Sequence, residues 1–362
     1  MLKKNILISL GILITVVLLL GISVVYYFKP NKELILNFIQ ENPSRSSIKL
    51  VRNDRILADL NSDIMMPLAS TVKIILAIEY AEQAAVGLVN PDEEIELSEL
   101  DKFYVKNTDG EAHPNWLKSV NDKIKYDKIS IREIVKGMLK YSSNANTEWL
   151  SQKLGLDNIN NKLKSLGIKK HSEIYYIVSA LFVGKEKSPN LKGKKLEQNL
   201  RELKIDDYIK TTDKIHQKLL TQTTYKNDIG DLGLNIQKVW SDNLPGSTTF
   251  EYVEVMKKIN SRTYFSEKTQ KYLDEVMEWI LDNPVNQKWL EHSGMKGGST
   301  AFVLTKALYA TDKEGNKTEM AYFFNDLGII ENTRLQISMN EFDLNILTSP
   351  EFRDKVKTKL MN

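Results

Sequence analysis

The chain has 362 residues, 42% hydrophobic and 27% charged, a globular composition that at roughly 150 residues per domain allows two domains at most. Its 50 basic and 47 acidic residues leave a net charge of +3, too small for the broad basic field of nonspecific nucleic-acid binding. The absence of cysteine excludes thiol catalysis, disulfides and iron–sulfur clusters. The four histidines lack the spacing of paired metal ligands, so we expect no metal and no cofactor.

The N-terminal segment from Asn5 to Phe28 carries no charge over 24 residues. At about 1.5 Å rise per residue, a helix of this length spans the roughly 30 Å hydrocarbon layer of a membrane. We therefore predict a transmembrane anchor at residues 5–28 after a short cytoplasmic end at residues 1–4. The small residues of Gly21-Ile22-Ser23 also fit a cleaved secretory signal. Either interpretation predicts export, to the extracytoplasmic side of the cell membrane or into the medium.

The segment that follows the anchor is expected to be a polar linker over residues 29–45, because it contains the turn-prone Asn42-Pro43-Ser44. Two β-rich runs come next, Ile48–Val51 and Ile56–Leu60. The Asn53-Asp54 pair between them suits a tight turn, so we predict a β-hairpin.

Helical periodicity begins at Ser70, and Gly87 is placed to end that helix. Further helices are predicted over residues 131–141 and 147–154. Residues 300–311 and 318–324 are strand-like, and we expect the chain to close with another hairpin and then a helix capped by Ser349.

Strands near both ends with helices between them predict one α/β domain, an α+β sandwich, over residues 46–362. Its antiparallel sheet would be built from N- and C-terminal strands and flanked by helices. The centre of the chain would form an inserted all-helical subdomain.

A Ser-x-x-Lys tetrad can supply a nucleophile and its base, because residues i and i+3 share one face of a helix. The sequence contains three such tetrads, about the number expected by chance. Only Ser70-Thr71-Val72-Lys73 opens a predicted helix. A helix N-terminus presents free N–H groups to a developing anion, so we select Ser70 and Lys73 as the catalytic pair.

A second motif, Ser-x-Asn, has several matches. Ser142-Ser143-Asn144 lies between two amphipathic segments, where a short loop can hold a hydroxyl and an amide rigidly. Ser241-Asp242-Asn243 is followed by Pro245-Gly246, so turn chemistry explains it. Ser338-Met339-Asn340 is expected in the closing hairpin. We therefore favour Ser142 and Asn144, although the same loop could simply cap a helix.

A third motif, Lys296-Gly297-Gly298-Ser299, is the only Lys-Gly-Gly in the chain and leads into the strand-like run at 300–311. Two glycines let a substrate backbone approach a strand edge closely. The alternative is a simple bulge beside a solvated lysine.

In this order and context, the three motifs resemble the S-x-x-K, S-D-N and K-T-G signatures of class A serine β-lactamases and related penicillin-binding proteins. The likeness extends over Met66–Lys73 and Met138–Asn146 and covers roughly residues 45–362. It implies a serine hydrolase that acts through an acyl-enzyme.

The resemblance assigns a role to each motif residue. Ser70 would be the acylated nucleophile and Lys73 its base, while Ser142 would pass a proton to the leaving nitrogen. Asn144 would hold the substrate amide and Lys296 would attract the substrate carboxylate. The remaining substrate-binding residues would be Gly297, Gly298 and Ser299, with the N–H groups of Ser70 and Ser299 as the oxyanion hole.

Physical chemistry makes this assignment coherent. Lys73 can act as a base only when it is neutral, and burial together with the Lys296 charge would lower its pKa. Two cations beside a nucleophile favour an anionic acyl donor, such as a β-lactam carboxylate or a peptide ending in D-alanine.

The sequence departs from the family pattern at three places. Ser143 replaces the aspartate of the second signature, and Gly297 replaces the threonine of the third. The Glu-x-x-Leu-Asn segment that carries the deacylating carboxylate is missing between these signatures, where Glu197–Arg201 comes nearest. We therefore expect intact acylation and slow β-lactam turnover.

The function predicted from the sequence is a membrane-anchored serine hydrolase that acts on a β-lactam or on a D-alanyl amide or ester. A D,D-peptidase or a D-alanyl esterase of the cell wall remains an alternative within this class. A noncatalytic protein that binds penicillin or a wall fragment is the alternative from another class.

Overall fold

The computed structural model describes Gly21 and residues 26–361. The predicted cytoplasmic end and nearly all of the predicted anchor at residues 5–28 lie outside the described residues. Among the helices that are described, none combines the length and apolar character needed to cross a membrane.

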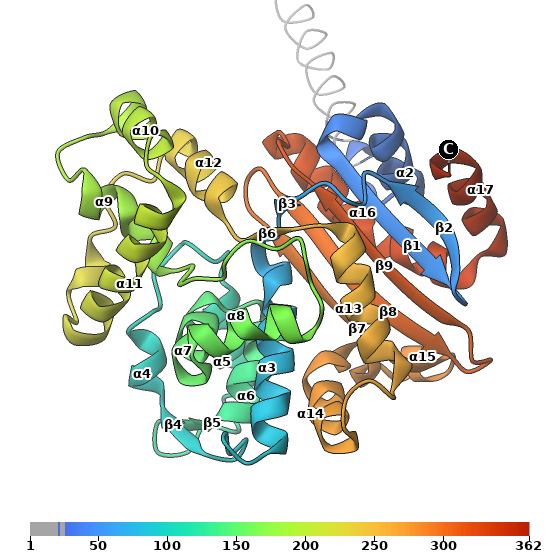
Figure 1. Ribbon diagram of the computed structural model, residues 1–362, viewed down its shortest axis with the longest axis horizontal. Coiled ribbons are helices and arrows are strands. Elements are labelled where there is room, and N and C mark those ends of the chain that lie inside the picture. The colour runs from blue at the N-terminus through green and yellow to red at the C-terminus, as the bar shows by residue number, and fades with distance from the viewer. Residues whose placement is uncertain (1–20, 22–25, 362) are drawn as a thin grey trace, which may run out of the picture.

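The centre of the fold is a five-stranded antiparallel sheet with the strand order β2-β1-β9-β8-β7 (Figure 1). Two of its strands come from the N-terminal end of the domain and three from the C-terminal end, which confirms the predicted composite sheet. Asn53 and Asp54 both have positive φ and form the tight turn of the first hairpin, as predicted. The strands are β1 (Ser46–Arg52), β2 (Arg55–Leu60), β7 (Leu290–Ser299), β8 (Leu304–Asp312) and β9 (Lys317–Phe324).

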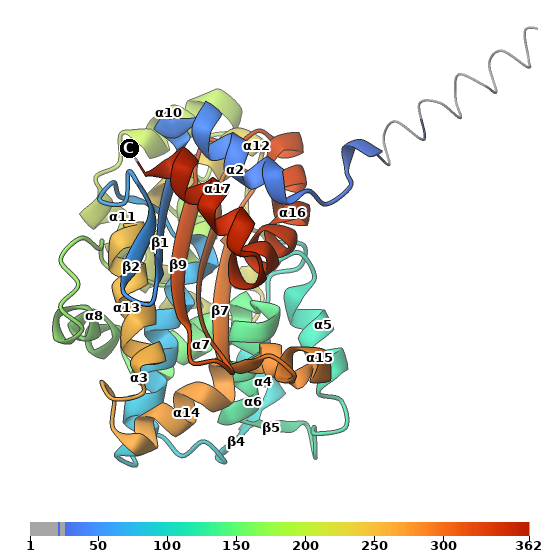
Figure 2. The same cartoon turned by 90° about the vertical axis from the view of Figure 1, so that its right-hand side faces the viewer.

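Helices cover both faces of this sheet (Figure 2). Alternate side chains of β8 enter two separate apolar clusters, with Ala307 and Tyr309 on one face and Leu304 and Leu308 on the other, as the two-residue period of a strand dictates. The first face packs against α13 (Thr249–Ser261). The second is covered by α2 (Lys32–Glu41), α16 (Ile329–Thr348) and α17 (Pro350–Leu360).

The chain between β2 and β7 is largely helical, as predicted, although it is not all-helical and its helix α13 packs on the sheet (Figure 1). Two short ribbons, β3 (Met66–Pro67) with β6 (Gly246–Ser247) and β4 (Glu94–Glu96) with β5 (Lys128–Ser130), lie within this stretch. Its other helices are α3 (Lys73–Ala85), α4 (Leu97–Asp101), α5 (Ala112–Ser119), α6 (Ile131–Lys136), α7 (Asn144–Leu154), α8 (Leu156–Ser165), α9 (Val183–Lys187), α10 (Gly193–Arg201), α11 (Ile205–Thr221), α12 (Leu234–Asn243), α14 (Glu267–Met277) and α15 (Pro284–Gln287).

The linker predicted at residues 29–45 is wrong, because most of it is the helix α2. Asn31 caps this helix, and Ile35, Leu36 and Ile39 are fully buried against the sheet and α16. Apolar residues at this spacing outweigh the turn residues that follow them. The folded domain therefore begins before residue 46.

The predicted closing hairpin is also wrong, since residues 329–348 form α16. Leu335, Met339, Phe342 and Ile346 recur every three or four residues and are buried, which is the period of a helix. The strand expected at residues 300–311 begins later, because 300–303 connect β7 to β8.

Candidate active site

Ser70 lies in a short 3₁₀ turn, Ala69–Val72, that leads directly into α3. Ala69 has a φ of 45°, a left-handed conformation that is strained for a residue with a side chain and is held by its surroundings. This turn places Ser70 at the N-terminal end of the helix, where unpaired backbone N–H groups gather.

Lys73 begins α3 and is completely buried. Its Nζ donates to the Ser142 carbonyl oxygen at 2.8 Å, to Ser142 Oγ at 3.2 Å and to Asn144 Oδ1 at 2.8 Å. Burial, and then the charge of Lys296, hold the pKa of Lys73 well below its usual value. A buried amine with a lowered pKa therefore lies in contact with Ser142 and Asn144.

Ser142 and Asn144 lie in the turn between a π-helical segment at Gly137–Tyr141 and α7. Ser142 has a φ of 69°. Ser143 caps α7 by accepting the Asn146 N–H, and its Oγ is 2.8 Å from Nδ1 of the buried His113. The predicted loop is thus a rigid cap that directs both polar side chains toward Lys73.

His113 was not found by sequence reasoning, which considered histidines only as metal ligands. It comes from α5, thirty residues before Ser143. No local motif connects these two positions, so only the folded structure assigns His113 to the support of this loop.

The third motif lies within the edge strand β7 rather than before a strand. Lys296 Nζ donates to Ser142 Oγ at 3.1 Å and to the Gly297 carbonyl oxygen at 2.7 Å. At Gly298, a Cβ would come within 2.5 Å of the Ser70 nitrogen and 2.6 Å of the Leu68 carbonyl oxygen. Close approach of two backbones therefore requires glycine at 298.

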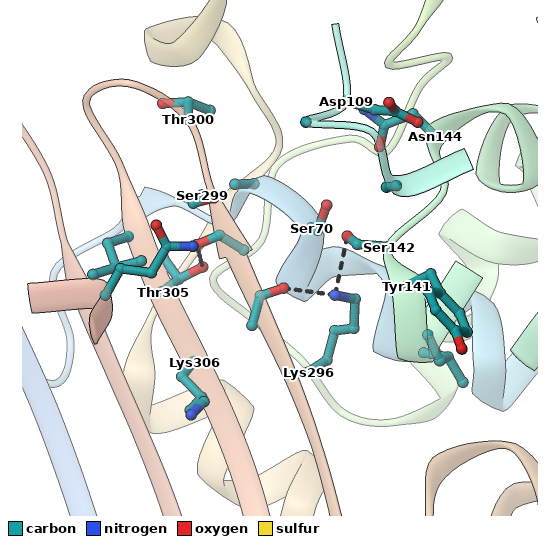
Figure 3. A pocket seen from close by; sticks show the side chains of 18 of the residues that line it. Ser70, Asp109, Tyr141, Ser142, Asn144, Lys296, Ser299, Thr300, Thr305 and Lys306 are labelled. Carbon is teal, nitrogen blue, oxygen red and sulfur yellow. Dashed lines mark hydrogen bonds between the residues drawn. The ribbon is translucent and has the colours of Figure 1, made fainter. Parts of the chain in front are cut away.

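The three motifs, far apart in the sequence, line one cleft of about 710 Å³ (Figure 3). Ser70 and Ser142 face each other across it, and Lys296 reaches toward Ser142 from the strand. Burial and the nearby Lys306 lower the pKa of Lys296 to about 7. The other predicted residues on its wall are Asn144, Gly297, Gly298 and Ser299.

This cleft brings together a serine at a helix N-terminus and an amine on an edge strand, and Ser142 on its wall contacts the buried Lys73 amine. A family model described as the Beta-lactamase enzyme family matches residues 32–259. The chain belongs to the β-lactamase family. It is a serine hydrolase of the β-lactamase-like type, which confirms the resemblance of the three motifs.

Solved β-lactamase structures share the fold at low sequence identity. The Chitinophaga pinensis β-lactamase matches with a TM-score of 0.53 and 14% identity over 87% of this chain and 99% of that chain. The Sphaerobacter thermophilus β-lactamase matches with a TM-score of 0.52 and 16% identity over 87% of this chain and 97% of that chain. The extended-spectrum β-lactamase TLA-3 matches with a TM-score of 0.53 and 14% identity over 87% of this chain and 98% of that chain. No curated protein matches the chain.

Two candidates from the sequence lie elsewhere in this β-lactamase-like fold. Ser241-Asp242-Asn243 ends α12, and Ser241 Oγ donates to Thr300 Oγ1 at 2.9 Å. Glu197–Arg201 lies in α10, where Arg201 Nε pairs with Glu197 Oε1 at 3.1 Å. Neither segment lines the cleft. The turn interpretation of residues 241–243 is wrong in detail, because these residues end a helix.

The connection after α8 contributes an isoleucine, Ile177, to the cleft of this β-lactamase-like protein. Glu148, on α7, is fully buried and accepts hydrogen bonds from the N–H groups of Val178 and Ser179. Among the described residues that line the cleft, Asp109 is the only acid, and its Oδ2 accepts the His113 N–H. The other oxygen of this carboxylate, Asp109 Oδ1, is buried and has no hydrogen-bond partner among the described residues.

Gly298→Ala is expected to lower the acylation rate by about 100-fold, because a displacement near 1 Å in a catalytic array has a cost of that size. The added methyl also overpacks the contact with Leu68, which we expect to lower stability by about 1–3 kcal/mol. Stopped-flow acylation and thermal unfolding would measure the two effects.

Gly297→Ala is the matched control for stability, because a Cβ there meets only the Thr305 carbonyl oxygen at 3.4 Å. Its melting temperature should stay near that of the wild type. Equal destabilisation of the two variants would show that the close approach at Gly298 is not what requires glycine.

Proposed function

We propose that this protein forms an acyl-enzyme on Ser70 with a β-lactam, or with a D-alanyl amide or ester, and hydrolyses it slowly. The observation that carries this proposal is that the buried Lys73 amine contacts Ser142, which lines one cleft together with Ser70 and Lys296. Burial and the Lys296 charge lower the pKa of Lys73, which favours the neutral amine that a general base requires.

Acylation requires two proton transfers. Lys73 takes the proton of Ser70 Oγ as Oγ adds to the substrate carbonyl, and the N–H groups of Ser70 and Ser299 stabilise the oxyanion. The C–N bond of a lactam or amide then breaks. Its nitrogen receives a proton from Ser142 Oγ, which is replaced by one from Lys73 along the 3.2 Å contact. In an ester, the leaving oxygen receives that proton.

The other side chains of the cleft determine which polar groups of a substrate can bind there. Asn144 accepts from Lys73 through Oδ1, which leaves its amide N–H groups to donate to a substrate carbonyl. Lys296, when protonated, attracts a carboxylate. Glycine at 297 supplies no hydroxyl to that carboxylate, so Ser299 at the edge of the cleft takes this role.

Deacylation is proposed to be slow. A water that attacks the acyl-enzyme needs a general base, and proton transfer of this kind contributes typically 10²–10⁴-fold. Glu148 is engaged by backbone N–H groups and does not line the cleft. Asp109 does line it, but its Oδ2 accepts the His113 N–H and its Oδ1 is buried.

A chromogenic cephalosporin should therefore give a burst close to one equivalent per protein and then steady turnover slower than the burst by about 100-fold or more. Absorbance measured from milliseconds to minutes would separate the two phases. Turnover at ordinary enzymatic rates, without a burst, would contradict slow deacylation while leaving acylation intact.

The pH dependence of acylation should reflect the titration of the Lys296 amine. Its pKa of about 7 in the free protein means that its charge is present below pH 7 and lost above it. For a penicillin carboxylate, this loss should lower the second-order acylation rate by about tenfold between pH 6 and pH 8. Lys296→Arg stays charged and should flatten this decrease. An uncharged penicillin ester is the control, and an equal decrease for the ester would assign the pH effect to another group.

The direct test of the proposed function is the intact mass of the protein after incubation with benzylpenicillin, and separately with a D-alanyl-D-alanine peptide. A stable penicillin adduct on Ser70 supports slow deacylation. A protein that forms no adduct and cleaves no peptide would instead be a noncatalytic binding protein.

We also propose that residues 5–28 anchor the protein in the cell membrane, with the hydrolase domain on the extracytoplasmic side. The 24 uncharged residues of the sequence support this. Fractionation of cells followed by N-terminal sequencing tests it. An intact N-terminus in the membrane pellet is expected, and a mature chain in the medium that begins after Ser23 would show a cleaved signal.

A further inference from the structure

The exposed face of α16 carries large apolar side chains beside the point where the continuously described chain begins. Ile330 and Ile337 are 60% and 39% exposed. They lie four residues before and three residues after Arg334, so the three residues share one face of the helix. Tyr27 is exposed and its ring lies against Arg334, and Tyr26, which is also exposed, precedes it in the chain. A contiguous group of this kind marks an interaction surface. We call it the α16 face, and it consists of Tyr26, Tyr27, Ile330, Arg334 and Ile337.

Arg334 holds the start of the continuously described chain against this face through two contacts with Tyr27. Its Nε donates to the Tyr27 carbonyl oxygen at 3.2 Å, and its guanidinium lies 3.8 Å from the centre of the Tyr27 ring. Further along, the Asn31 N–H donates to Ser338 Oγ at 3.2 Å, and α2 then packs along α16 (Figure 2). Residues 27–31 are therefore attached to the domain and do not form a free tether.

This attachment fixes where a membrane surface must lie. The charge-free segment of the sequence ends at Phe28, next to the residue that Arg334 holds. A chain spans at most roughly 3.5 Å per residue, so the last anchor residues cannot leave the bilayer far from α16. Tyrosine and isoleucine side chains suit the interface between headgroups and acyl chains, and arginine suits anionic headgroups.

We propose that the α16 face docks on the surface of the lipid bilayer. The apolar side chains of Ile330 and Ile337 then lie in the interfacial layer, and Arg334 lies among anionic headgroups. This inference rests on the anchoring by residues 5–28 proposed above, and it adds a fixed orientation of the domain to that anchoring.

The orientation has a consequence for the substrate. Gln336 and Asn340 of the same helix line the catalytic cleft, together with Thr300. Asn332 also donates to the Thr300 carbonyl oxygen at 2.8 Å, which links α16 to the end of the cleft labelled by Thr300 in Figure 3. Docking therefore holds the cleft beside the bilayer and favours acyl donors attached to a membrane over soluble ones.

The sequence contains no cysteine, so a single introduced cysteine is the only site that a thiol-reactive label can modify. The full chain carrying Ile337→Cys is labelled with an environment-sensitive fluorophore and reconstituted into vesicles of phosphatidylcholine and phosphatidylglycerol. We expect a blue-shifted emission that is reduced at least about twofold by nitroxide lipids. The matched control is Leu88→Cys, which is 76% exposed beyond the end of α3 and should show neither effect.

Co-sedimentation with the vesicles separates the two proposals. A chain that sediments while its label at 337 is quenched only by aqueous iodide overturns the docking and leaves the anchoring intact. A chain that stays in the supernatant overturns both. Quenching that depends on protein density at constant lipid would assign the face to contact between copies and also overturns the docking. If Ile337→Cys does not match the wild-type melting temperature, Ile330→Cys replaces it.

Discussion

Ser70→Ala should abolish the penicillin adduct and lower hydrolysis of any acyl donor by on the order of 10⁴-fold or more, because no other group can form the covalent intermediate. The remaining cleft still binds the substrate through Asn144 and Lys296. Removal of one hydroxyl from a half-buried turn leaves the fold unchanged, so thermal unfolding should match the wild type. Intact mass and a chromogenic assay measure the loss.

Labelled peptides from the wild-type adduct locate the acylated residue. Ser142 is the control, because its hydroxyl lies in the same cleft and contacts both amines. Ser142→Ala should slow acylation without moving the adduct away from Ser70. An adduct that persists in Ser70→Ala would show that the nucleophile has been assigned to the wrong serine.

Lys73→Met should slow acylation by about 10²–10⁴-fold, the usual contribution of a general base. Methionine fills a similar volume without a polar group, so the site stays packed. The wild-type lysine loses hydration when the chain folds and its pKa falls, which opposes folding at neutral pH. The variant removes that cost but leaves the Ser142 carbonyl oxygen and Asn144 Oδ1 without their Lys73 donor. Its melting temperature should therefore stay near that of the wild type while its acylation is slow.

This interpretation requires acylation to fall without a comparable loss of stability. Lys306 offers a comparison, because it is also buried but pairs with Asp343. Lys306→Met leaves that carboxylate unpaired and should lower the melting temperature. Rapid acylation of Lys73→Met at neutral pH would contradict the proposed role of Lys73 as the general base.

Local sequence determined the elements that depend on neighbouring residues. The Asn53-Asp54 turn follows from residues that tolerate positive φ. Helical periodicity predicted a helix at Ser70, which the structure begins with a 3₁₀ turn before α3. The Ser143 cap of α7 corresponds to the alternative given for the loop at residues 142–144. The order of the three motifs predicted the family, because each motif keeps its chemistry within a few residues.

Tertiary structure decided what distant segments do to one another. Gly298 is required by its approach to Ser70 and Leu68, more than two hundred residues away. The low pKa of Lys73 depends on burial by the whole fold. α2 was missed although its apolar residues have helical spacing, because only the packed structure shows that they lie against α16 and the sheet. Such contacts cannot be predicted from spacing along the chain, since burial and close approach are properties of the packed molecule.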